Sequence, residues 1–507
     1  MIQDEHIKQD DDENKEGKIT VAYASFTVIS LTIGAGMVAM PRSWFDSGLP
    51  FGVWYNIFNF AATIYSIHLY YESARVTNLW SIPRIGYECF GYASFYIASC
   101  ITFLLFGLFP IAYMMIFAGL SSSLIQEIPY VKQQEYSFLG KRWFSVLILA
   151  TWMFPLIIRR KIQELKILGF VYFCVVITFI VLMLYLIITS SEKLPYKPGD
   201  SKEFMESKLD RKFLSSLSVS LVAFAFQPAF FSLWNAVKEK TYKNCMLFWL
   251  NGLGFWFVIY MAITFIGLYS FGVQIKGNCL DNVTDLDVWQ AYIMRVTFLI
   301  VISWQTPFIF FVGKESLLEM IALIYTQMGY YQKHEDEDDD QLIRQLEGQN
   351  EQFLDNYGKS LSIKNSNVLE RYTSDCSASM PIAYKGNKQI KSMVMSYKDE
   401  GEYKSLADNL PSYIWYIATI WLYAVVVTTA CLTHEVKLII DFVGSLGTSI
   451  IDYTLPGIYY FVIMRKYKAL GPGQAWEAWF ALIFAIYGII IGIFCTVFNV
   501  WAIISPP

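Results

Sequence analysis

The stretch Ser30-Leu-Thr-Ile-Gly34-Ala-Gly36-Met-Val-Ala-Met-Pro41-Arg-Ser-Trp-Phe45-Asp-Ser-Gly48-Leu-Pro-Phe-Gly52 decides the fold. It begins inside an apolar segment that starts near residue 20 and is long enough to cross a bilayer, which takes about 20 apolar residues. Glycine weakens a helix by about 1 kcal/mol relative to alanine. Gly34 and Gly36 therefore either break the helix at mid-depth, where irregular backbone is tolerated only beside a cavity, or let two helices pack closely.

The composition around this stretch is that of a polytopic membrane protein. The chain has 507 residues, of which 55% are hydrophobic, 17% aromatic and only 16% charged, and its mean hydropathy is +0.39. A soluble chain of this length divides into domains with charged surfaces. Here the charged residues are concentrated between long apolar segments. The net charge of −4 comes largely from acidic clusters outside those segments and says little about partners.

The apolar segments predict an all-α protein with about eleven transmembrane helices. Residues 76–93, which contain Pro83, predict a short re-entrant or surface segment between spans 2 and 3. The predicted spans cover approximately residues 20–41, 52–74, 94–124, 143–158, 166–190, 213–236, 244–272, 288–312, 412–431, 437–463 and 476–503.

Two polar segments lie outside the spans. Residues 1–18 are acidic, and residues 331–409 contain the run Glu335-Asp-Glu-Asp-Asp-Asp340 and few apolar stretches. Neither can bury enough apolar area to fold alone, which predicts disorder. We therefore divide the chain into this tail, spans 1–8 in 19–330, a cytosolic insert at 331–409 and spans 9–11 in 410–507. The insert is a possible docking segment for a protein partner.

Several classes of protein are excluded by what the chain lacks. The eight cysteines are scattered singly without a CxxC pair, which indicates neither a metal site nor a redox motif. Of the four histidines, only His68 lies in a predicted span, and no nucleophile–base grouping suggests a membrane hydrolase. We expect no enzyme activity, no cofactor, no metal site and no nucleic-acid partner.

Span 6 contains a second helix breaker. Its middle reads Phe224-Ala-Phe-Gln227-Pro228-Ala-Phe-Phe231. Proline inside a helix removes a backbone hydrogen bond and kinks or breaks it, and Gln227 is a polar residue near mid-membrane. Spans 1 and 6 each open a run of five spans. Two interrupted helices at equivalent places predict a LeuT-like inverted five-plus-five repeat with broken helices 1 and 6.

Span 1 also resembles a known family. Its pattern of small residues and proline is similar to the first transmembrane helix of the amino acid/auxin permease (AAAP) family, within the amino acid–polyamine–organocation (APC) superfamily. The string Ala-Phe-Ala-Phe-Gln at 223–227 resembles helix 6 of that family more loosely. The resemblance implies a broken helix 1 whose exposed backbone binds the amino and carboxyl groups of an amino acid. The matching positions in span 1 are Gly34, Ala35, Gly36, Pro41, Phe45, Gly48 and Gly52.

The two breaks define the expected substrate site. A half-helix N-terminus favours a carboxylate, and unwound carbonyls favour an ammonium group or a cation. Thr32 would add a hydroxyl and Gln227 an amide, while the two phenylalanines either line the side-chain pocket or serve ordinary packing. The substrate-binding candidates are Thr32, Ile33, Gly34, Ala35, Gly36, Met37, Phe224, Phe226 and Gln227.

Four residues are candidates for ion coupling. Sodium-coupled members of the family typically have asparagine four residues before the first glycine of helix 1, and this chain has Ser30 there. Ser303 and Thr306 on span 8 either supply oxygens to a cation or hydrogen-bond their own backbone. Asp452 in span 10 is the most deeply placed ionisable residue, and a carboxyl there is either functional or faces an internal polar pocket and bonds to a neighbouring span. We predict proton coupling rather than sodium coupling, because burial favours the neutral, protonated acid.

Charge bias gives an orientation. Basic residues follow spans 4, 6 and 10 (159–161, 238–243 and 465–468), which predicts a cytosolic N-terminus. The lysines in 191–212 count against this, while the sequon at Asn282 falls on the outer side and predicts glycosylation there. The leading interpretation is a symporter of neutral amino acids in the plasma membrane or an endolysosomal or vacuolar membrane, working by alternating access. The alternative is a transporter-like amino-acid sensor or complex subunit.

Overall fold

The structure is a computed structural model of the chain. It describes residues 20–32, 34–128, 138–160, 166–189, 194–196, 200–206, 211–237, 241–286, 288–328, 405–433, 443–469 and 475–504. The predicted acidic tail and nearly all of the predicted insert lie outside these residues.

The regular elements in the described residues are helices. The main α-helices are α2 (Val21–Thr32), α3 (Ala35–Ser47), α4 (Leu49–Thr77), α6 (Tyr92–Gln126), α8 (Arg142–Ile157), α9 (Lys166–Thr189), α11 (Arg211–Ala223), α12 (Pro228–Ala236), α13 (Tyr242–Phe271), α15 (Trp289–Gln327), α19 (Ser412–Leu432), α21 (Leu455–Lys466) and α22 (Ala475–Ile504). Shorter elements are α5 (Ile82–Phe90), α10 (Asp200–Met205), α14 (Cys279–Thr284), η3 (Gly272–Gln274) and η4 (Leu406–Asn409), and η5 (Val443–Thr454) is a π-helix.

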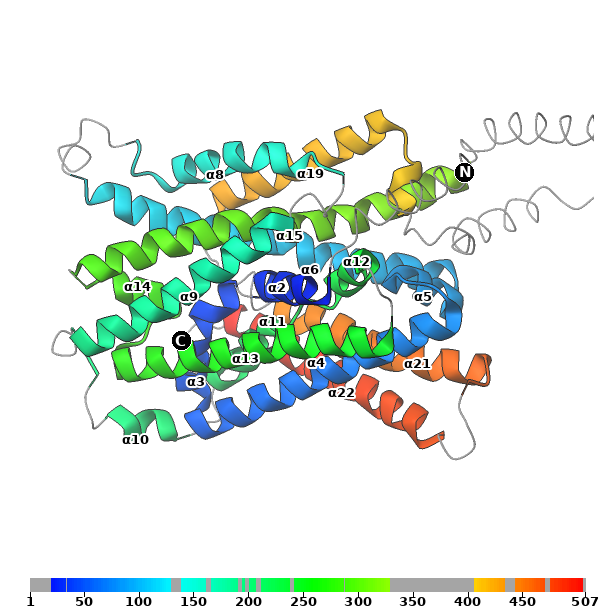
Figure 1. Ribbon diagram of the computed structural model, residues 1–507, viewed down its shortest axis with the longest axis horizontal. Coiled ribbons are helices and arrows are strands. Elements are labelled where there is room, and N and C mark those ends of the chain that lie inside the picture. The colour runs from blue at the N-terminus through cyan, green and yellow to red at the C-terminus, as the bar shows by residue number, and fades with distance from the viewer. Residues whose placement is uncertain are drawn as a thin grey trace, which may run out of the picture. The chain divides into compact units, whose positions relative to one another are not determined.

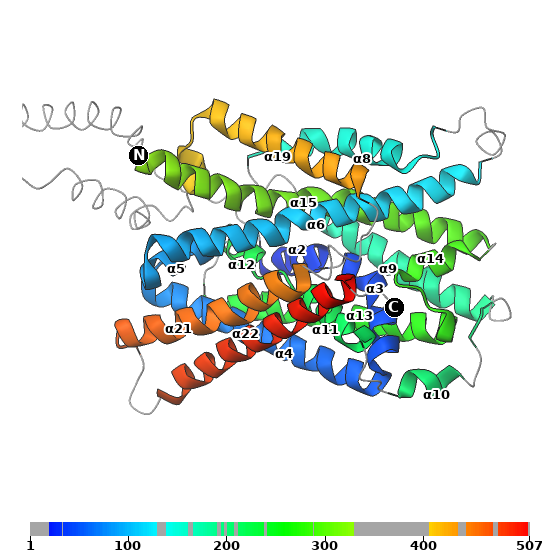
Figure 2. The ribbon, with the colours of Figure 1, turned by 180° about the vertical axis from the view of Figure 1, so that it is seen from behind.

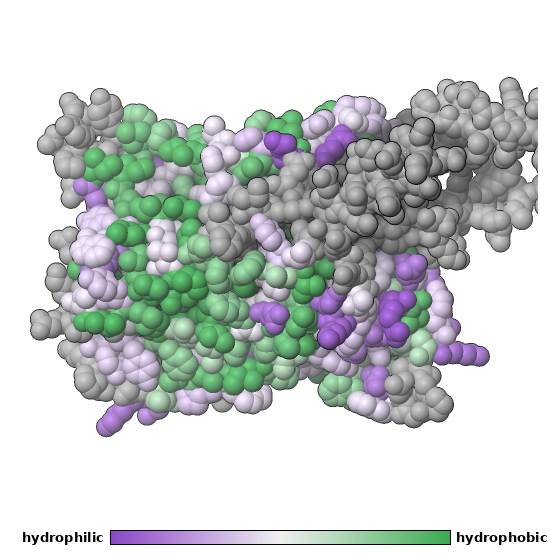
Figure 3. Space-filling model, viewed as in Figure 1, coloured by the Kyte–Doolittle hydropathy of each residue, from purple (hydrophilic) through white to green (hydrophobic). Residues whose placement is uncertain are grey.

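The helices are those of an integral, multi-pass membrane protein. Six helical segments among the described residues are long and apolar enough to cross a membrane: α6, 216–234, α13 with η3, α15, α19 and 475–501. Large apolar side chains such as Trp54, Ile417 and Trp421 are exposed on the surface. Figure 3 shows hydrophobic residues over the middle of one face and hydrophilic residues gathered toward its ends, which is the distribution that a bilayer requires.

Both predicted breaks are present. Span 1 is divided into α2 and α3, with Gly34 preceding the first residue of α3 in an extended conformation. Span 6 is divided into α11 and α12, and Pro228 is the first residue of α12. Proline is well placed there, because the first residue of a helix has no intrahelical partner for its N–H group in any case.

The element order is that of the predicted inverted five-plus-five repeat. Each broken helix is followed by four long helical segments: α4, α6, α8 and α9 in the first run, and α13, α15, α19 and η5–α21 in the second. A short helix follows the first of these four segments in each run: α5 comes after α4, and α14 comes after α13. These two short helices lie at opposite ends of the bundle in both Figure 1 and Figure 2, as inversion of one run relative to the other requires.

The broken helices pack at the centre of the bundle. The second half of span 1, α3, packs along α11, while α2 packs against α13 and α9. The side chains of Trp44, Trp234, Trp249 and Trp256 are fully buried around these half-helices. Burial of such large aromatic surfaces is a main source of packing energy.

Span 10 differs from the predicted continuous α-helix. Its first part, η5, is a π-helix of 12 residues. Two side chains supply hydrogen bonds that fit this winding: Thr454 donates to the carbonyl of Ser449 (3.1 Å), and Tyr70 of α4 donates to the carbonyl of Ile451 (2.7 Å). The winding therefore depends on packing that the sequence pattern of span 10 does not reveal.

Helix α15 also extends about 15 residues beyond the predicted end of span 8 at residue 312, to Gln327. Lys314 interrupts the apolar pattern but is buried, because its ammonium group donates to the carbonyls of Ile157 and Arg159, both at 3.0 Å. It thereby satisfies free carbonyls at the C-terminal end of α8. A charged residue with backbone partners need not end a buried helix.

The chain divides into two compact units, Met1–Leu317 with Ser412–Pro507, and Leu318–Pro411. In the second unit, η4 begins with a capping box in which Ser405 and Asp408 bond each other's backbone. The Ser405 hydroxyl also lies 3.5 Å from a carboxylate oxygen of Glu319. The C-terminal end of the predicted insert is therefore structured.

Candidate functional site

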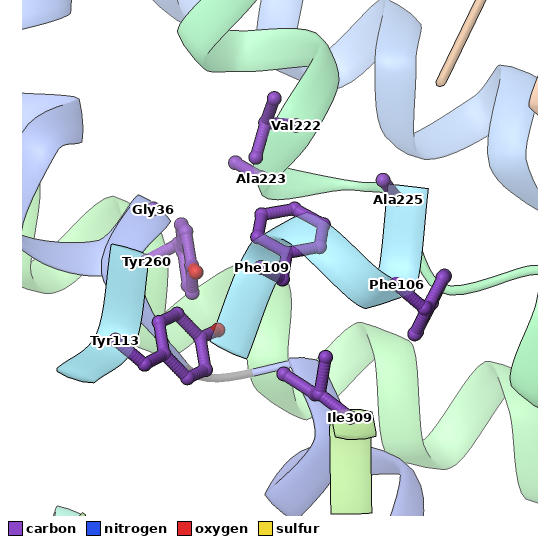
Figure 4. A pocket seen from close by; sticks show the side chains of 9 residues that line it. All are labelled: Gly36, Phe106, Phe109, Tyr113, Val222, Ala223, Ala225, Tyr260 and Ile309. Atoms are coloured by element: carbon purple, nitrogen blue, oxygen red, sulfur yellow. The ribbon is translucent and has the colours of Figure 1, made fainter. Parts of the chain in front are cut away.

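A small cavity lies between the two breaks. Its walls come from α3, the end of α11 and the linker that follows it, and from α6, α13 and α15 (Figure 4). It has a volume of about 20 Å³, which is room for about one water molecule. The cavity is lined by Gly36, Phe106, Phe109, Tyr113, Val222, Ala223, Ala225, Tyr260 and Ile309.

Gly36 makes the closest contact across the cavity. A Cβ atom on Gly36 would lie 3.1 Å from the Cα and Cβ atoms of Ala223 and 3.1 Å from the hydroxyl oxygen of Tyr260. The same hydroxyl lies within reach of the backbone of Gly34 and Met37. Gly36 thus lets the backbone of α3 approach both the end of α11 and a polar group of α13.

Gly34 is equally crowded on the other side of the break. A Cβ atom there would overlap the hydroxyl of Tyr113 and come within 2.9 Å of the amide nitrogen of Gln305. Two polar side chains, one from α6 and one from α15, are therefore held against the unwound backbone of span 1. The close approach leaves no space for any residue larger than glycine at position 34.

The half-helices give the cavity opposite partial charges on two sides. The N-terminus of α3 begins beside Gly36, and a helix N-terminus carries free N–H groups and positive partial charge. The C-terminus of α11 ends at Ala223, where carbonyl groups carry negative partial charge. Figure 4 shows the tyrosine rings beside Gly36, and Phe106 on the far side of Phe109. The cavity is therefore polar at one end and apolar at the other.

The residues that line this cavity include no charged side chain. The arrangement of opposite helix ends, hydroxyl groups and apolar rings matches the chemistry of a neutral zwitterion, whose two charges need partners while its side chain needs none.

Comparison with known families agrees with this geometry. A family model described as transmembrane amino acid transporter protein matches residues 17–505. The chain belongs to this family. The match covers both broken helices and every element that lines the cavity.

The individual relatives that match this chain have low sequence identity to it. A putative sodium-coupled neutral amino acid transporter 11 from Danio rerio is 24% identical over 273 residues, covering 54% of this chain and 59% of the relative. The rat protein of the same name is 24% identical over 155 residues, covering 31% of this chain and 34% of the relative. The chain thus spans less than two thirds of the length of these curated relatives.

Similarity to solved structures is low. MhsT in complex with L-phenylalanine gives a TM-score of 0.41 at 11% identity, covering 93% of this chain and 98% of that one. A manganese transporter from Eremococcus coleocola also gives 0.41 at 11% identity, covering 96% and 94%.

The two phenylalanines of span 6 pack against tryptophans of α13. The ring of Phe224 packs edge-on against Trp256 (centroids 4.6 Å apart), and that of Phe226 stacks on Trp249 (5.0 Å). Neither lines the cavity, so the packing role is the one observed. Ala223, the last residue of α11, and Ala225 in the linker line the cavity instead.

Gln227 is fully buried, and its side-chain oxygen accepts a hydrogen bond from the backbone N–H of Phe226 (2.9 Å). It does not line the cavity. Its amide nitrogen has no hydrogen-bond partner in the described structure. In this conformation the amide is therefore not part of the cavity wall.

The remaining predicted substrate residues lie at the break itself. Met37 is buried one residue beyond the cavity-lining Gly36. Ile33 lies outside the described residues, as do the side chains of Ser30, Thr32 and Ala35. The structure therefore brings together Gly34, Gly36 and Met37 from the predicted set.

The predicted ion-coupling residues of α15 bond within their own helix. The hydroxyl of Ser303 donates to the carbonyl of Leu299, and that of Thr306 donates to the carbonyl of Ile302, both at 2.6 Å. The side chain that α15 presents to the span 1 break is Gln305. Gln305 lies between Ser303 and Thr306, and a polar residue at that place in an apolar span is the sequence feature that could have identified it.

The predicted glycosylation site at Asn282 is buried. Its side-chain nitrogen donates to the carbonyl of Gln274 and its side-chain oxygen accepts from the N–H of Lys276, both at 2.8 Å. A glycan attaches to that same nitrogen and needs it exposed. This geometry is incompatible with a glycan on Asn282. The side chain instead connects α14 to η3 and the residues after it by hydrogen bonds.

Proposed function

We propose that this family member is a symporter of neutral amino acids that works by alternating access. The observation that carries the proposal is the contact of Gly36, at the N-terminus of α3, with Ala223, at the C-terminus of α11, beside an uncharged cavity. A transporter with two broken helices places its substrate between the half-helix ends.

In the proposed complex, the substrate carboxylate binds the free N–H groups of α3 and the hydroxyls of Tyr113 and Tyr260. The ammonium group binds carbonyls at the end of α11. The side chain then extends toward Phe106, Ala225 and Ile309. Each charge of the zwitterion is met by a dipole or hydroxyl, and no buried charge is left without a partner.

Alternating access explains why the cavity is small. About 20 Å³ cannot hold an amino acid, so the half-helices must move apart to admit one. Gly34, before α3, and the residues between α11 and α12 are the proposed hinges, because hinges lie at a few residues at element ends. In the proposed cycle, the small closed cavity lies between two open states.

The proposed driving ion is the proton. The relatives' names specify sodium, a hard cation that prefers several oxygen ligands. In this chain Ser30 stands where sodium-coupled members typically have asparagine, and the hydroxyls of Ser303 and Thr306 donate within α15. Asp452, by contrast, is a buried carboxyl in span 10. These features favour protonation of Asp452 over sodium binding near span 1.

The proposed orientation has a cytosolic N-terminus. Basic residues that follow spans 4 and 10 anchor one end of the bundle: Arg160 donates to the hydroxyl of Ser412 (3.0 Å), and Lys466 pairs with Glu88 of α5 (2.6 Å). Basic loops prefer the cytosolic side. The membrane would be the plasma membrane or an endolysosomal or vacuolar membrane.

Exchange in proteoliposomes tests the proposed function. Vesicles containing the purified full-length chain are loaded with unlabelled alanine, and entry of labelled alanine is measured. We expect exchange well above that of empty vesicles. Binding of labelled alanine without exchange would contradict transport and support the alternative, an amino-acid sensor.

A further inference from the structure

The carboxyl group of Asp452 sits in an unusual environment. The residue is 2% exposed, and its Oδ1 atom has no hydrogen-bond partner in the described structure. A buried carboxyl is normally paired or hydrogen-bonded. The element that carries it, η5, is a long π-helix, and π-helical segments are rare and occur frequently at functional sites.

Other polar groups without partners occur on the helices that pack around η5. In the described residues, the hydroxyls of Ser99 and Thr102 on α6, Ser66 on α4 and Thr448 on η5 have no hydrogen-bond partner, although all four residues are buried. Many buried hydroxyls in the described residues bond a carbonyl of their own helix; Ser73 of α4, for example, donates to Leu69 at 2.7 Å. These four hydroxyls can instead accept or donate elsewhere.

Two contacts place Ser99 and Thr102 of α6 along the same interval of the bundle as Thr448 and Asp452 of η5. Helix α6 runs antiparallel to η5 and α21: the hydroxyls of Ser94 and Tyr459 lie 3.0 Å apart, and a Cβ atom on Gly447 would lie 2.7 Å from the side chain of Leu105. Ser99 and Thr102 lie between the two contact points on α6. Thr448 and Asp452 lie between them on the facing helix.

We propose that Asp452, Thr448, Ser99 and Thr102 form a binding site for a small monovalent cation, apart from the substrate cavity. A carboxylate with several hydroxyl oxygens is a ligand set for a hard cation, and the same hydroxyls can hydrogen-bond a protonated carboxyl. The site therefore suits a proton on Asp452 or a sodium ion. The inference rests on the proposed transport function and specifies where its driving ion binds.

Among the described residues, no charged side chain competes for Asp452. The ionisable groups that interact with it are the phenols of Tyr70 on α4 and Tyr453 on η5. Among the described residues of α6, α11, α21 and α22, no charged side chain contributes to its electrostatic environment. A cation is thus the one charged species that balances an ionised Asp452.

The site is connected to the substrate cavity through η5. Gly444, about two π-helical turns before Asp452, is packed so closely on α11 that a Cβ atom there would overlap the side chain of Val222 and the carbonyl of Ser218. Val222 lines the cavity. A close-packed contact transmits displacement because interiors have little free volume. Binding of a cation at Asp452 can therefore alter the cavity from a distance.

The test compares accumulation with exchange. Thr102→Val removes one proposed ligand and keeps the side-chain shape. Thr419→Val is the matched control, because Thr419 on α19 is also buried with a hydroxyl that lacks a partner. Labelled alanine accumulation is measured in proteoliposomes under an interior-alkaline pH gradient without sodium, and separately under an inward sodium gradient at equal pH. Exchange of labelled for unlabelled alanine is measured in parallel, and Asp452→Asn is included.

We expect Thr102→Val to lower accumulation by about 5- to 150-fold, the usual range for a coupling between two sites, and Asp452→Asn to lower it at least as much. Exchange should persist in both variants, and Thr419→Val should match the wild type. If the variants lose accumulation under the pH gradient, the site binds the proton. If they lose accumulation under the sodium gradient, the site binds sodium. If Thr102→Val and Asp452→Asn both accumulate alanine like the wild type under either gradient, the proposed cation site is wrong. Absence of exchange in the wild type would instead contradict the proposed function.

Discussion

Gly36 of α3 and Ala223 of α11 lie in contact across the cavity. A Cβ atom on Gly36 would lie 3.1 Å from both the Cα and the Cβ atom of Ala223. This contact joins the two broken helices at the point where their dipoles end. In the proposed site, the space available to a substrate therefore depends on the size of residue 36.

The first prediction follows from that contact. Gly36→Val adds side-chain atoms where even one Cβ is crowded, so we expect exchange to fall to the level of empty vesicles. Overpacking of this kind costs about 1–3 kcal/mol, which an inserted helix bundle can tolerate, and size-exclusion chromatography should show a monodisperse protein.

Gly254→Val on α13 is the control, because a Cβ atom there meets no other atom within 4 Å. It should exchange like the wild type. If Gly36→Val misfolds, Gly36→Ala provides a milder test and should still reduce exchange. Normal exchange by a folded Gly36→Val protein would show that the glycine only serves helix packing.

The second prediction concerns the hydroxyl of Tyr113. Tyr113→Phe removes a hydrogen-bond donor to the proposed carboxylate, and a hydrogen bond to a charged group contributes about 1.5–3 kcal/mol. We expect the KM for alanine exchange to rise about 10- to 150-fold. Tyr423→Phe removes a hydroxyl that donates to the carbonyl of Ala150 (2.6 Å) in the contact of α19 with α8 and should leave KM unchanged. Equal KM values for Tyr113→Phe and the wild type would remove Tyr113 from the site.

The third prediction concerns selectivity. Because the residues lining the cavity carry no charge, burying a charged substrate side chain there is costly. Unlabelled neutral amino acids in excess should therefore compete with labelled alanine, whereas lysine, arginine, aspartate and glutamate should not. Competition by a charged amino acid as strong as that by alanine itself would mean that substrates bind elsewhere.

The fourth prediction concerns Asn282. We expect no glycan on this residue in a glycosylating host, so treatment with a glycosidase should not change its mobility on a gel. Asn282→Ala leaves the carbonyl of Gln274 and the N–H of Lys276 without their partner and should lower thermal stability by the equivalent of about 1–3 kcal/mol. A glycan found at Asn282, or unchanged stability of the variant, would contradict the structural role.

The two breaks were predictable from sequence because their causes are local. Glycine pairs and proline disrupt a helix wherever they occur, so Gly34, Gly36 and Pro228 marked the positions without knowledge of the neighbours. The polytopic class followed in the same way from the apolar segments, whose lengths are set by the bilayer.

The walls of the cavity were not predictable from the same rules. Helices α6 and α13 are apolar on all sides, so their sequences do not indicate which face meets the broken helices. The sequence therefore gave no indication that Tyr113 and Tyr260 line the cavity. The orientation of Phe224 and Phe226 depends on Trp256 and Trp249 of α13, against which their rings pack, and these partners are remote in the sequence. The π-helix depends on Tyr70, a residue remote in sequence.

Accumulation of labelled alanine tests the central claim most directly. The purified wild-type chain is reconstituted into sodium-free proteoliposomes, and an interior-alkaline pH gradient is imposed. The account predicts that alanine rises transiently above the external concentration and that a protonophore abolishes this accumulation. Alanine that never exceeds the external concentration under the pH gradient, or accumulates only when a sodium gradient is supplied, would contradict proton-driven symport.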